Sequence, residues 1–459
     1  MPIDPEELAQ SINALVRWAQ QHAPAAESPL RRRIADHLGG DPASMPIVTE
    51  AMGAYERANL QAALDAWLEA GDRSAETLGL GGAHGWRPGL GEVIRSGPMF
   101  PLVEAGPVEY ASVDVGDRRI RAVRSGLFLL TSGDERLVAS LTADERGMSE
   151  SLRLEVMAAG ADVAEALVRD LRALMVEHNV YRGRVLELTG DEGELNVAVR
   201  SLPQVPRERI VLPPGVLERV ERHTLGVARH AQRLREAGRH IKRGLLLHGP
   251  PGTGKTLTAM HLSGRMPDRT VLLLTGMALY SVAAACRMAR TLAPAMIVLE
   301  DVDLVAEDRD LYDGSQPMLF QLLNEMDGLA EDADVVFVLT TNRLEVLEQA
   351  LAARPGRVDE AVELPLPDAE GRRRLLALYS EGLDVRAGDM TRVVEQTEGL
   401  SPAFIRELVR RAALIAAEEG DGALVVAERH LTTALEELRS STDQVTRALL
   451  GADDDLDVY

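Results

Sequence analysis

The sequence has 459 residues but only one cysteine, Cys286, and few aromatic residues. A single cysteine excludes an intramolecular disulfide and a cysteine-cluster metal site, which is typical of proteins in a reducing cytoplasm. Aromatic residues make up 3% of the chain and apolar residues 46%, so its cores must be packed mainly with aliphatic side chains.

Long apolar runs and a secretory signal are also missing. The longest apolar run, residues 271–286, is interrupted by Thr275, Gly276 and Ser281. It is shorter than the roughly 20 residues that a membrane-spanning helix needs. The first ten residues, MPIDPEELAQ, are acidic and lack the charged-then-apolar layout of a signal peptide. We therefore expect a soluble cytoplasmic protein without a membrane span.

Basic residues are scarce relative to acidic ones. The chain carries 50 Lys and Arg against 72 Asp and Glu, a net charge of −22 with His neutral. Nucleic-acid affinity comes largely from Lys and Arg that displace counterions, so this balance argues against DNA or RNA as a partner. A local basic patch remains compatible with this overall negative charge.

Residues 1–80 are expected to form a helical segment. Asp4 can cap a first helix, and a second is expected to start after Thr49 and to end at Gly71-Asp72. A loop at residues 39–42 separates them, and the glycine-rich stretch 79–92 is suited to a linker.

Residues 81–205 are expected to form a small α+β domain. Short β-prone runs over 108–141 are separated by turns at Gly116-Asp117 and Ser132-Gly133-Asp134. A long amphipathic helix is expected over 149–178, followed by two strands in YRGRVLELTGDEGELNVAV. Residues 1–205 show no catalytic or ligand spacing, so we interpret them as a scaffold or a substrate-docking region.

Strand and helix signals alternate after Pro213-Pro214, the mark of an α/β fold with a parallel sheet covered on both faces. The expected strands are RGLLLHG, TVLLLTG, AMIVLED, DVVFVLTTN and EAVELPLP. Open sheets of this kind bind ligands at the carboxyl ends of their strands.

The first of these strands runs into GPPGTGKT, which fits the phosphate-loop pattern. Its glycines let the backbone turn N–H groups towards a β-phosphate at a helix N-terminus. Lys255 can reach the β- and γ-phosphates, and the Thr256 hydroxyl can ligate Mg²⁺. The motif predicts an ATP site formed by Gly249, Pro250, Pro251, Gly252, Thr253, Gly254, Lys255 and Thr256.

Two further strands end in polar residues. Glu300 and Asp301 follow the third strand, an arrangement suited to phosphoryl transfer to water, in which one carboxylate positions Mg²⁺ and the next polarises the attacking water. Asn342 ends the fourth strand and is placed to hold that water, although a strand-end Asn is also a common turn former.

Two arginines, Arg354 and Arg357, flank Pro355-Gly356 before the fifth strand. Within one subunit they have no obvious role near the phosphate loop. In a ring they can reach a neighbour's γ-phosphate as arginine fingers.

The order of these motifs resembles the AAA+ family, and most closely its main AAA subgroup of protein remodellers. The resemblance covers about Ile210 to Glu436 and rests on GPPGTGKT, QLLNEMDGL, TTNR and ARPGRVDEAVELPLPD. It implies a P-loop NTPase module, with a large domain over 206–367 and a helical lid over 368–445. It also implies a hexameric ring, Mg-dependent ATP hydrolysis at subunit interfaces and work on a protein substrate.

Two site features also follow from the resemblance alone. Residues 327–329 are implied to sense the neighbouring nucleotide, and TEGLSPAFIRELVRRAA resembles the lid helix start near the adenine and phosphates.

Three features depart from the family pattern. The usual Asp-Glu pair is reversed to Glu300-Asp301, as in a branch of mitochondrial inner-membrane AAA translocases, which predicts slow turnover. The pore segment is shortened to MALYSVAAACRMARTLAP, where Tyr280 either grips substrate or, as we expect, packs with the helix that follows. Residues 446–459 form an acidic tail that lacks the hydrophobic-Tyr-any ending of proteasome-activating ATPases.

These observations predict a cytoplasmic AAA+ ATPase ring that remodels a protein recognised by its N-terminal half. No HExxH sequence occurs, so no peptidase of the metalloprotease type is expected. Two alternatives stay open: a nucleotide-gated scaffold with little hydrolysis, and a nucleic-acid motor on the same fold.

Overall fold

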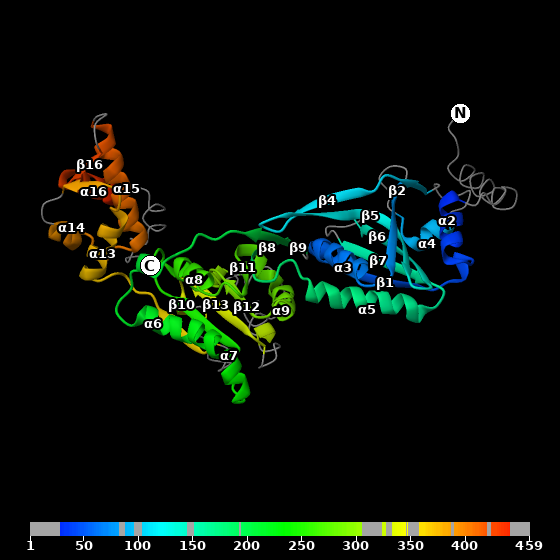
Figure 1. The fold of residues 1–459 in the computed structure, drawn as a ribbon. Helices are drawn as coiled ribbons and strands as arrows, with labels where there is room; N and C mark the ends of the chain where they lie inside the picture. The colour runs from blue at the N-terminus through cyan, green and yellow to red at the C-terminus, as the bar shows by residue number, and fades with distance from the viewer. Residues whose placement is uncertain are drawn as a thin grey trace, which may run out of the picture. The chain divides into compact units, whose positions relative to one another are not determined.

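The computed structural model describes residues 28–81, 88–95, 103–144, 151–191, 194–304, 324–326, 333–345, 347, 358–386, 390–419 and 424–440. The chain divides into two compact units (Figure 1). The first comprises residues 1–181 and 190–199, and the second comprises residues 182–189 and 200–459.

A sheet of seven strands forms the framework of the first unit. Its order is β1-β7-β6-β5-β2-β3, with β4 paired to β5, and the pairs are antiparallel. The strands are β1 (Ile47–Gly53), β2 (Arg73–Gly81), β3 (Glu104–Gly106), β4 (Glu109–Asp114), β5 (Arg119–Ser132), β6 (Glu135–Asp144) and β7 (Ser151–Ala158).

Helices cover both faces of this sheet. They are α2 (Pro29–Leu38), α3 (Arg57–Glu69), α4 (Leu90–Arg95) and α5 (Ala161–Glu177), with short 3-10 turns η1 (Pro42–Ser44) and η2 (Ala54–Glu56). Alternation along β5 supplies both cores: Phe128 and Leu130 pack in the core that includes α3 and α5, while Leu127 and Leu129 pack in the core that includes α2 and α4.

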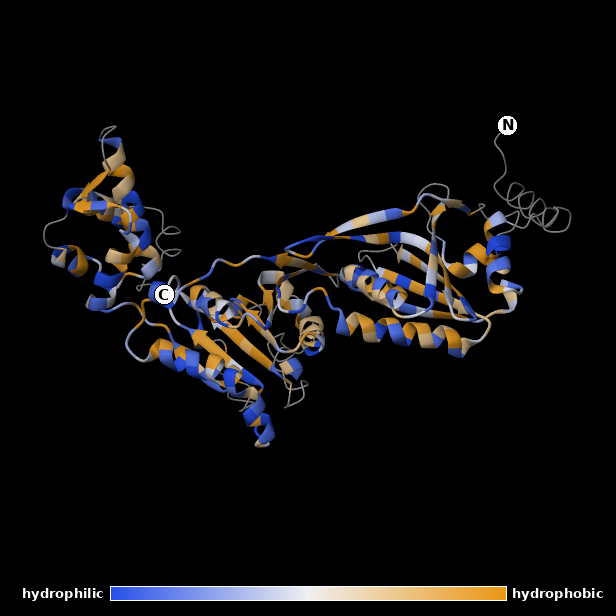
Figure 2. Cartoon of the chain, viewed as in Figure 1, coloured by the Kyte–Doolittle hydropathy of each residue, from blue (hydrophilic) through white to orange (hydrophobic). Residues whose placement is uncertain are grey.

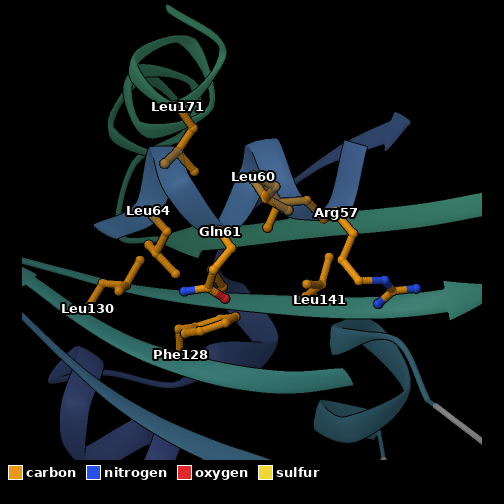
Figure 3. Close-up of a pocket in the computed structure, with 10 residues that line it drawn as sticks. Arg57, Leu60, Gln61, Leu64, Phe128, Leu130, Leu141 and Leu171 are labelled. Carbon is orange, nitrogen blue, oxygen red and sulfur yellow. The ribbon is translucent and has the colours of Figure 1, made fainter. Parts of the chain in front are cut away.

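The core under α3 and α5 contains a small cavity of about 20 Å³ (Figure 3). Leu60 and Leu64 of α3, Leu171 of α5 and Phe128 of β5 are among the side chains that line it. This volume holds about one water molecule and no larger ligand, so the cavity is a packing defect of the core.

Two expectations for the first unit are wrong in part. A helix was expected from Thr49 onward and another from residue 149, but residues 47–53 and 151–158 are strands β1 and β7. The reason for β7 is the alternation of its side chains, because Leu152, Leu154 and Val156 are buried while Ser151, Arg153 and Glu155 are half-exposed. The helices begin later, at Arg57 and Ala161, and the turns at 116–117 and 132–134 are confirmed.

The expected division at residue 80 falls inside β2, so the helical segment and the α+β region share one sheet. The stretch 79–92, expected to be a linker, includes the end of β2 and the start of α4. The first helix expected from Asp4 lies outside the described residues.

The sheet of the second unit has the order β14-β10-β13-β12-β11-β8. The five strands expected from the sequence are β10 (Arg243–His248), β11 (Thr270–Leu274), β12 (Ala295–Leu299), β13 (Val335–Thr341) and β14 (Glu360–Glu363). Neighbours among them pair in parallel, and β11, β12 and β13 are apolar along most of their length (Figure 2).

The sheet is larger than the five strands expected. Strand β8 (Val185–Asp191) pairs in parallel with β11, whereas residues 194–199 of β9 (Glu194–Arg200) belong to the first unit. Strand β8 was expected in the small domain ending at residue 205, and this expectation is wrong because residues 182–189 belong to the second unit. Leu186 and Leu188 of β8 are fully buried, which explains why this strand joins the larger sheet.

Helices flank this sheet, and further helices follow in the segment expected to be the lid, for which we keep that name. The large domain has η4 (Arg207–Arg209), α6 (Val216–Glu221), the π-helical turn η5 (Arg222–Gly226), α7 (Val227–Glu236), α8 (Lys255–Gly264), η6 (Gly276–Ser281) and α9 (Val282–Thr291). The lid has α13 (Ala369–Tyr379), β15 (Asp384–Arg386), α14 (Thr391–Gln396), α15 (Pro402–Glu418), β16 (Val425–Ala427) and α16 (Glu428–Ser440).

The lid has an aliphatic core of its own, which includes Leu375, Leu408 and Leu435. Asp368 and Ser401 cap α13 and α15 by accepting hydrogen bonds from backbone N–H groups, as N-cap residues do. Among the described residues, no helix combines the length and the apolar character that a membrane crossing requires.

Candidate nucleotide site

The loop between β10 and α8 needs glycine at particular positions. Gly249, Gly252 and Gly254 have φ values of 141°, 75° and 99°, where L side chains are strained. A Cβ on Gly249 would lie 2.3 Å from the carbonyl oxygen of Leu364, and one on Gly252 would lie 2.8 Å from Ala403 Cβ. The loop therefore turns tightly against both the end of β14 and the start of the lid helix α15.

Hydrogen bonds within the loop hold its remaining residues. The Thr253 hydroxyl donates to the carbonyl of Pro250 at 2.9 Å, while Pro251 is exposed. Lys255 Nζ donates to the carbonyls of Gly249 and Pro250 at 2.7 and 2.9 Å. The ammonium group of the first residue of α8 is thus folded back over the loop.

Lys255 is buried, with 7% of its surface exposed. Burial lowers the pKa of its ammonium to about 8, while the Asp301 and Asp303 carboxylates act to raise it. At neutral pH the group still carries its charge, and a poorly solvated cation at this place is well suited to bind phosphate oxygens.

Thr256 and Glu300, the two residues expected to hold Mg²⁺, lie together. The hydroxyl of Thr256 hydrogen-bonds the Glu300 carboxylate, and this bond acts to lower the pKa of Glu300. Burial has the larger, opposite effect, and the neighbouring Asp301 also raises this pKa. A hydroxyl and a carboxylate are oxygen ligands of the kind that Mg²⁺ prefers, and Mg²⁺ usually takes only one or two from the protein.

Asp301 turns the chain sharply after β12. Its φ of 52° lies in the left-handed region, and among the described residues it is the only non-glycine with a positive φ. Its N–H donates to the Thr340 hydroxyl at 3.0 Å, and Asn342 Nδ2 donates to its Oδ1 at 3.2 Å. Asp301 and Asn342, expected from separate strand ends, therefore lie in direct contact.

The groups around Asp301 shift its pKa in opposite directions. Burial and the nearby Asp303 carboxylate raise the pKa of Asp301, whereas Lys255 and the hydrogen bond from Asn342 lower it. The site thus combines a cation, a hydroxyl, an amide and three carboxylates at the carboxyl edge of the sheet.

Comparison with known proteins agrees with this geometry. Residues 245–366 match the family described as "ATPase family associated with various cellular activities (AAA)". These residues are an AAA domain. The sequence resemblance and the α/β fold predicted for this part of the chain are thereby confirmed.

Several characterised proteins are similar to the part of the chain that contains the AAA domain. The chain is 33% identical over 226 residues to ATP-dependent zinc metalloprotease FtsH 1 of Sphaerobacter thermophilus, which covers 46% of this chain and 34% of that protein. It is 31% identical over 245 residues to the FtsH of Mesoplasma florum, covering 49% and 36%. It is 34% identical over 221 residues to human ATPase family gene 2 protein homolog A, covering 45% and 24%. The chain thus spans between a quarter and about a third of the length of these relatives.

Sequence reasoning missed one residue of the AAA domain, Asp303. Its carboxylate is buried, with 6% of the residue exposed. Oδ1 accepts hydrogen bonds from the Thr341 hydroxyl at 2.9 Å and from the Asn342 N–H at 3.4 Å. The signal was present in the sequence, because a third acidic residue follows Glu300-Asp301 at a spacing of two.

The lid contributes a contact to the loop. The Ala403 N–H donates to the carbonyl of Gly252 at 3.2 Å, and Ser401 Oγ lies close to the same glycine. The segment that resembles the family's lid helix start is therefore in contact with the phosphate loop.

The remaining predicted features of the AAA domain are two arginines, the segment 327–329 and Tyr280. Arg354, Arg357 and residues 327–329 lie outside the described residues. Tyr280 lies on η6 with 36% of its surface exposed, and Met277 of the same element is 62% exposed. The turn ends at Ser281, directly before α9 begins at Val282, and our expectation that Tyr280 packs with the following helix stays a prediction.

Proposed function

We propose that this chain hydrolyses Mg-ATP and works as a hexameric ring that remodels a protein partner. The observation that carries the proposal is the contact between Thr256 and Glu300 beside the contact between Asp301 and Asn342. One pair offers oxygen ligands for a metal ion and the other offers a carboxylate with an oriented amide. Both pairs adjoin a loop whose lysine faces inward.

Each residue has a distinct role in the proposed reaction. Lys255 and the loop N–H groups bind the β- and γ-phosphates, while Thr256 and Glu300 hold Mg²⁺. Asp301 polarises the attacking water, and Asn342 fixes the carboxylate through its amide. Because Asp is one methylene shorter than Glu, we expect slower turnover than a Glu at this position would give.

The protein partner is proposed on other grounds. Two of the relatives are named as proteases, so their substrates are proteins. This sequence has no HExxH, so the part it shares with them is the motor and not the peptidase. Exposed Met277 and Tyr280 on η6 are suited to contact an extended polypeptide. We assign partner recognition to the first unit.

A second candidate is a nucleotide-gated scaffold with little hydrolysis, which the Glu300-Asp301 order favours. A nucleic-acid motor is a weaker alternative, because the net charge of −22 repels phosphate backbones. Phosphate release stimulated by duplex DNA would favour that alternative.

The test of remodelling uses an unfolded model protein, carboxymethylated lactalbumin. We expect it to stimulate phosphate release by the wild type and Tyr280→Phe, which keeps the ring, but not by Tyr280→Ala. Equal stimulation of all three proteins would contradict the role of Tyr280. No stimulation of the wild type, together with turnover near zero, would favour the scaffold.

A further inference from the structure

A strongly basic segment stands out in this acidic chain. Residues 222–243 contain seven Lys and Arg and only one acidic residue, Glu236, whereas the whole chain has a net charge of −22. The segment covers η5, α7 and the approach to β10 in the second unit. Figure 2 shows α7 as predominantly hydrophilic.

Part of this positive charge is ion-paired or hydrogen-bonded within the fold. Arg235 lies 4.0 Å from Asp334, and Arg243 lies 4.0 Å from Asp359. Lys242 donates to the carbonyl of Met326 at 3.0 Å. These residues serve the packing of the large domain.

Three arginines of α7 and the turn after it remain without such a partner. Arg229, Arg233 and Arg239 are exposed, and none makes an ion pair with any residue that the structure describes. Arg229 and Arg233 are one helical turn apart, where like charges destabilise a helix by a few tenths of a kcal/mol. Glu236, the one acidic residue of the segment, accepts from Gln232 at 3.0 Å and, within the part of the chain that the structure describes, forms no ion pair with these arginines. We call Arg229, Arg233 and Arg239 the basic ridge.

We propose that the basic ridge binds the acidic segment of this same chain, residues 453–457. That segment, DDDLD, has four carboxylates in five residues, the densest acidic run of the sequence. It follows the last lid helix, α16, which ends at Ser440 in the same compact unit as the ridge. Asp453 comes 13 positions after Ser440, a length of chain that can span up to about 45 Å when extended.

The charges favour this occupant over a polyanion from outside. A nucleic acid that reached the ridge would also meet the excess negative charge of the rest of the chain. A tethered segment whose linker spans the two sites has an effective concentration of about millimolar, at which weak ion pairs suffice. Because exposed pairs contribute about 0–1 kcal/mol each and are screened by salt, the contact should be reversible and salt-sensitive.

Docking ties the end of the lid to the large domain. Ala403 of the lid also contacts Gly252 of the phosphate loop. The docked acidic segment would therefore restrain the movement of the lid relative to the phosphate loop. This consequence rests on the proposed ATPase activity. The docking does not depend on that activity, and it is measured without nucleotide.

The chain offers a selective reporter. Its one native cysteine, Cys286, is buried with 0% exposed, so a fluorophore attaches selectively to Leu456→Cys in the full-length folded protein. We expect the fluorophore's anisotropy to be high at about 25 mM NaCl and to fall about twofold at about 500 mM. Arg229→Glu/Arg233→Glu should give the low value at both salt concentrations.

The control has the same net charge. Arg118 and Arg169 are exposed arginines of the first unit, and Arg118→Glu/Arg169→Glu should keep the high anisotropy at low salt. Changing Asp453, Asp454 and Asp455 to Arg in the ridge variant should restore the high anisotropy at low salt, because the charges of the two partners are then exchanged. The proposal is overturned if the ridge variant keeps the wild-type anisotropy or if the control loses it equally. Duplex DNA that binds the wild type but not the ridge variant would assign the ridge to nucleic acid instead.

Discussion

Asn342 donates from Nδ2 to Oδ1 of Asp301 at 3.2 Å, joining the ends of two neighbouring parallel strands. The contact is possible because β12 and β13 pair in register, with Leu299 opposite Leu339. It places an oriented carboxylate beside a phosphate loop, which is the arrangement that hydrolysis of a phosphoanhydride needs.

The roles of the acidic pair can be separated by mutation. Asp301→Asn should bind ATP and hydrolyse it at least about tenfold more slowly, since a general base typically contributes 10²–10⁴ in rate. Glu300→Gln should mainly raise the Mg²⁺ concentration needed for half-maximal activity. Nucleotide binding and phosphate release, titrated with Mg²⁺, distinguish the two. If Glu300→Gln instead binds ATP tightly and stalls, the two roles are reversed.

Asp303 should orient Asn342 without contacting the nucleotide. Asp303→Ala leaves the Thr341 hydroxyl and the Asn342 N–H without their acceptor, which costs about 1–3 kcal/mol for each buried group left unpaired. Asp303→Asn keeps one acceptor oxygen, so it should lose less stability. We expect kcat to fall in both variants while the Kd for a nonhydrolysable ATP analogue changes little. Unaltered kcat in a destabilised Asp303→Ala protein would limit Asp303 to a structural role.

Gly252 should tolerate no side chain because of the lid. Gly252→Ala combines a φ of 75° with a Cβ at 2.8 Å from both Ala403 Cβ and Ser401 Oγ. Gly238 has a φ of 65° and no atom within 4 Å of the position that a Cβ would take, so Gly238→Ala is a control for backbone strain alone. Both should lose about 1 kcal/mol of stability from the left-handed backbone. Only Gly252→Ala should lose nucleotide affinity; equal affinities would mean that the lid contact is dispensable.

The buried strands and the loop were the parts most readily predicted from the sequence. Uninterrupted apolar runs such as MIVL have no exposed face, and this marks strands of a parallel sheet. Residues 151–158 were misread as helix because the alternation of Leu152, Leu154 and Val156 extends directly into the helical pattern of α5. Pairing of β8 with β11 could not be foreseen either, because it depends on contacts between residues far apart in the chain.

Side-chain contacts at the site were less predictable than the positions of the residues. The spacing of the motifs located Glu300, Asp301 and Asn342 but not the link that Asp303 makes to Thr341. An acidic residue after a strand is most often solvated, and only its burial reveals that it accepts hydrogen bonds from the next strand.

Arg354 and Arg357 should act across a subunit interface. Either arginine changed to Ala should abolish activity but preserve ATP affinity, because an arginine finger contributes about 10³–10⁵ to the rate. Mixing Arg357→Ala with Lys255→Ala subunits should restore part of the activity, since some interfaces then combine an intact loop with an intact arginine. A mixture that stays inactive although its subunits exchange would exclude sharing of the site.

The central claim, hydrolysis of ATP at the loop that contains Lys255, is tested most directly by steady-state phosphate release from Mg-ATP. The chain has two lysines, Lys242 and Lys255, so Lys242→Ala is a matched control with the same change of charge. The account predicts turnover by the wild type and Lys242→Ala, and none by folded Lys255→Ala. Phosphate release by Lys255→Ala at the wild-type rate would contradict the account.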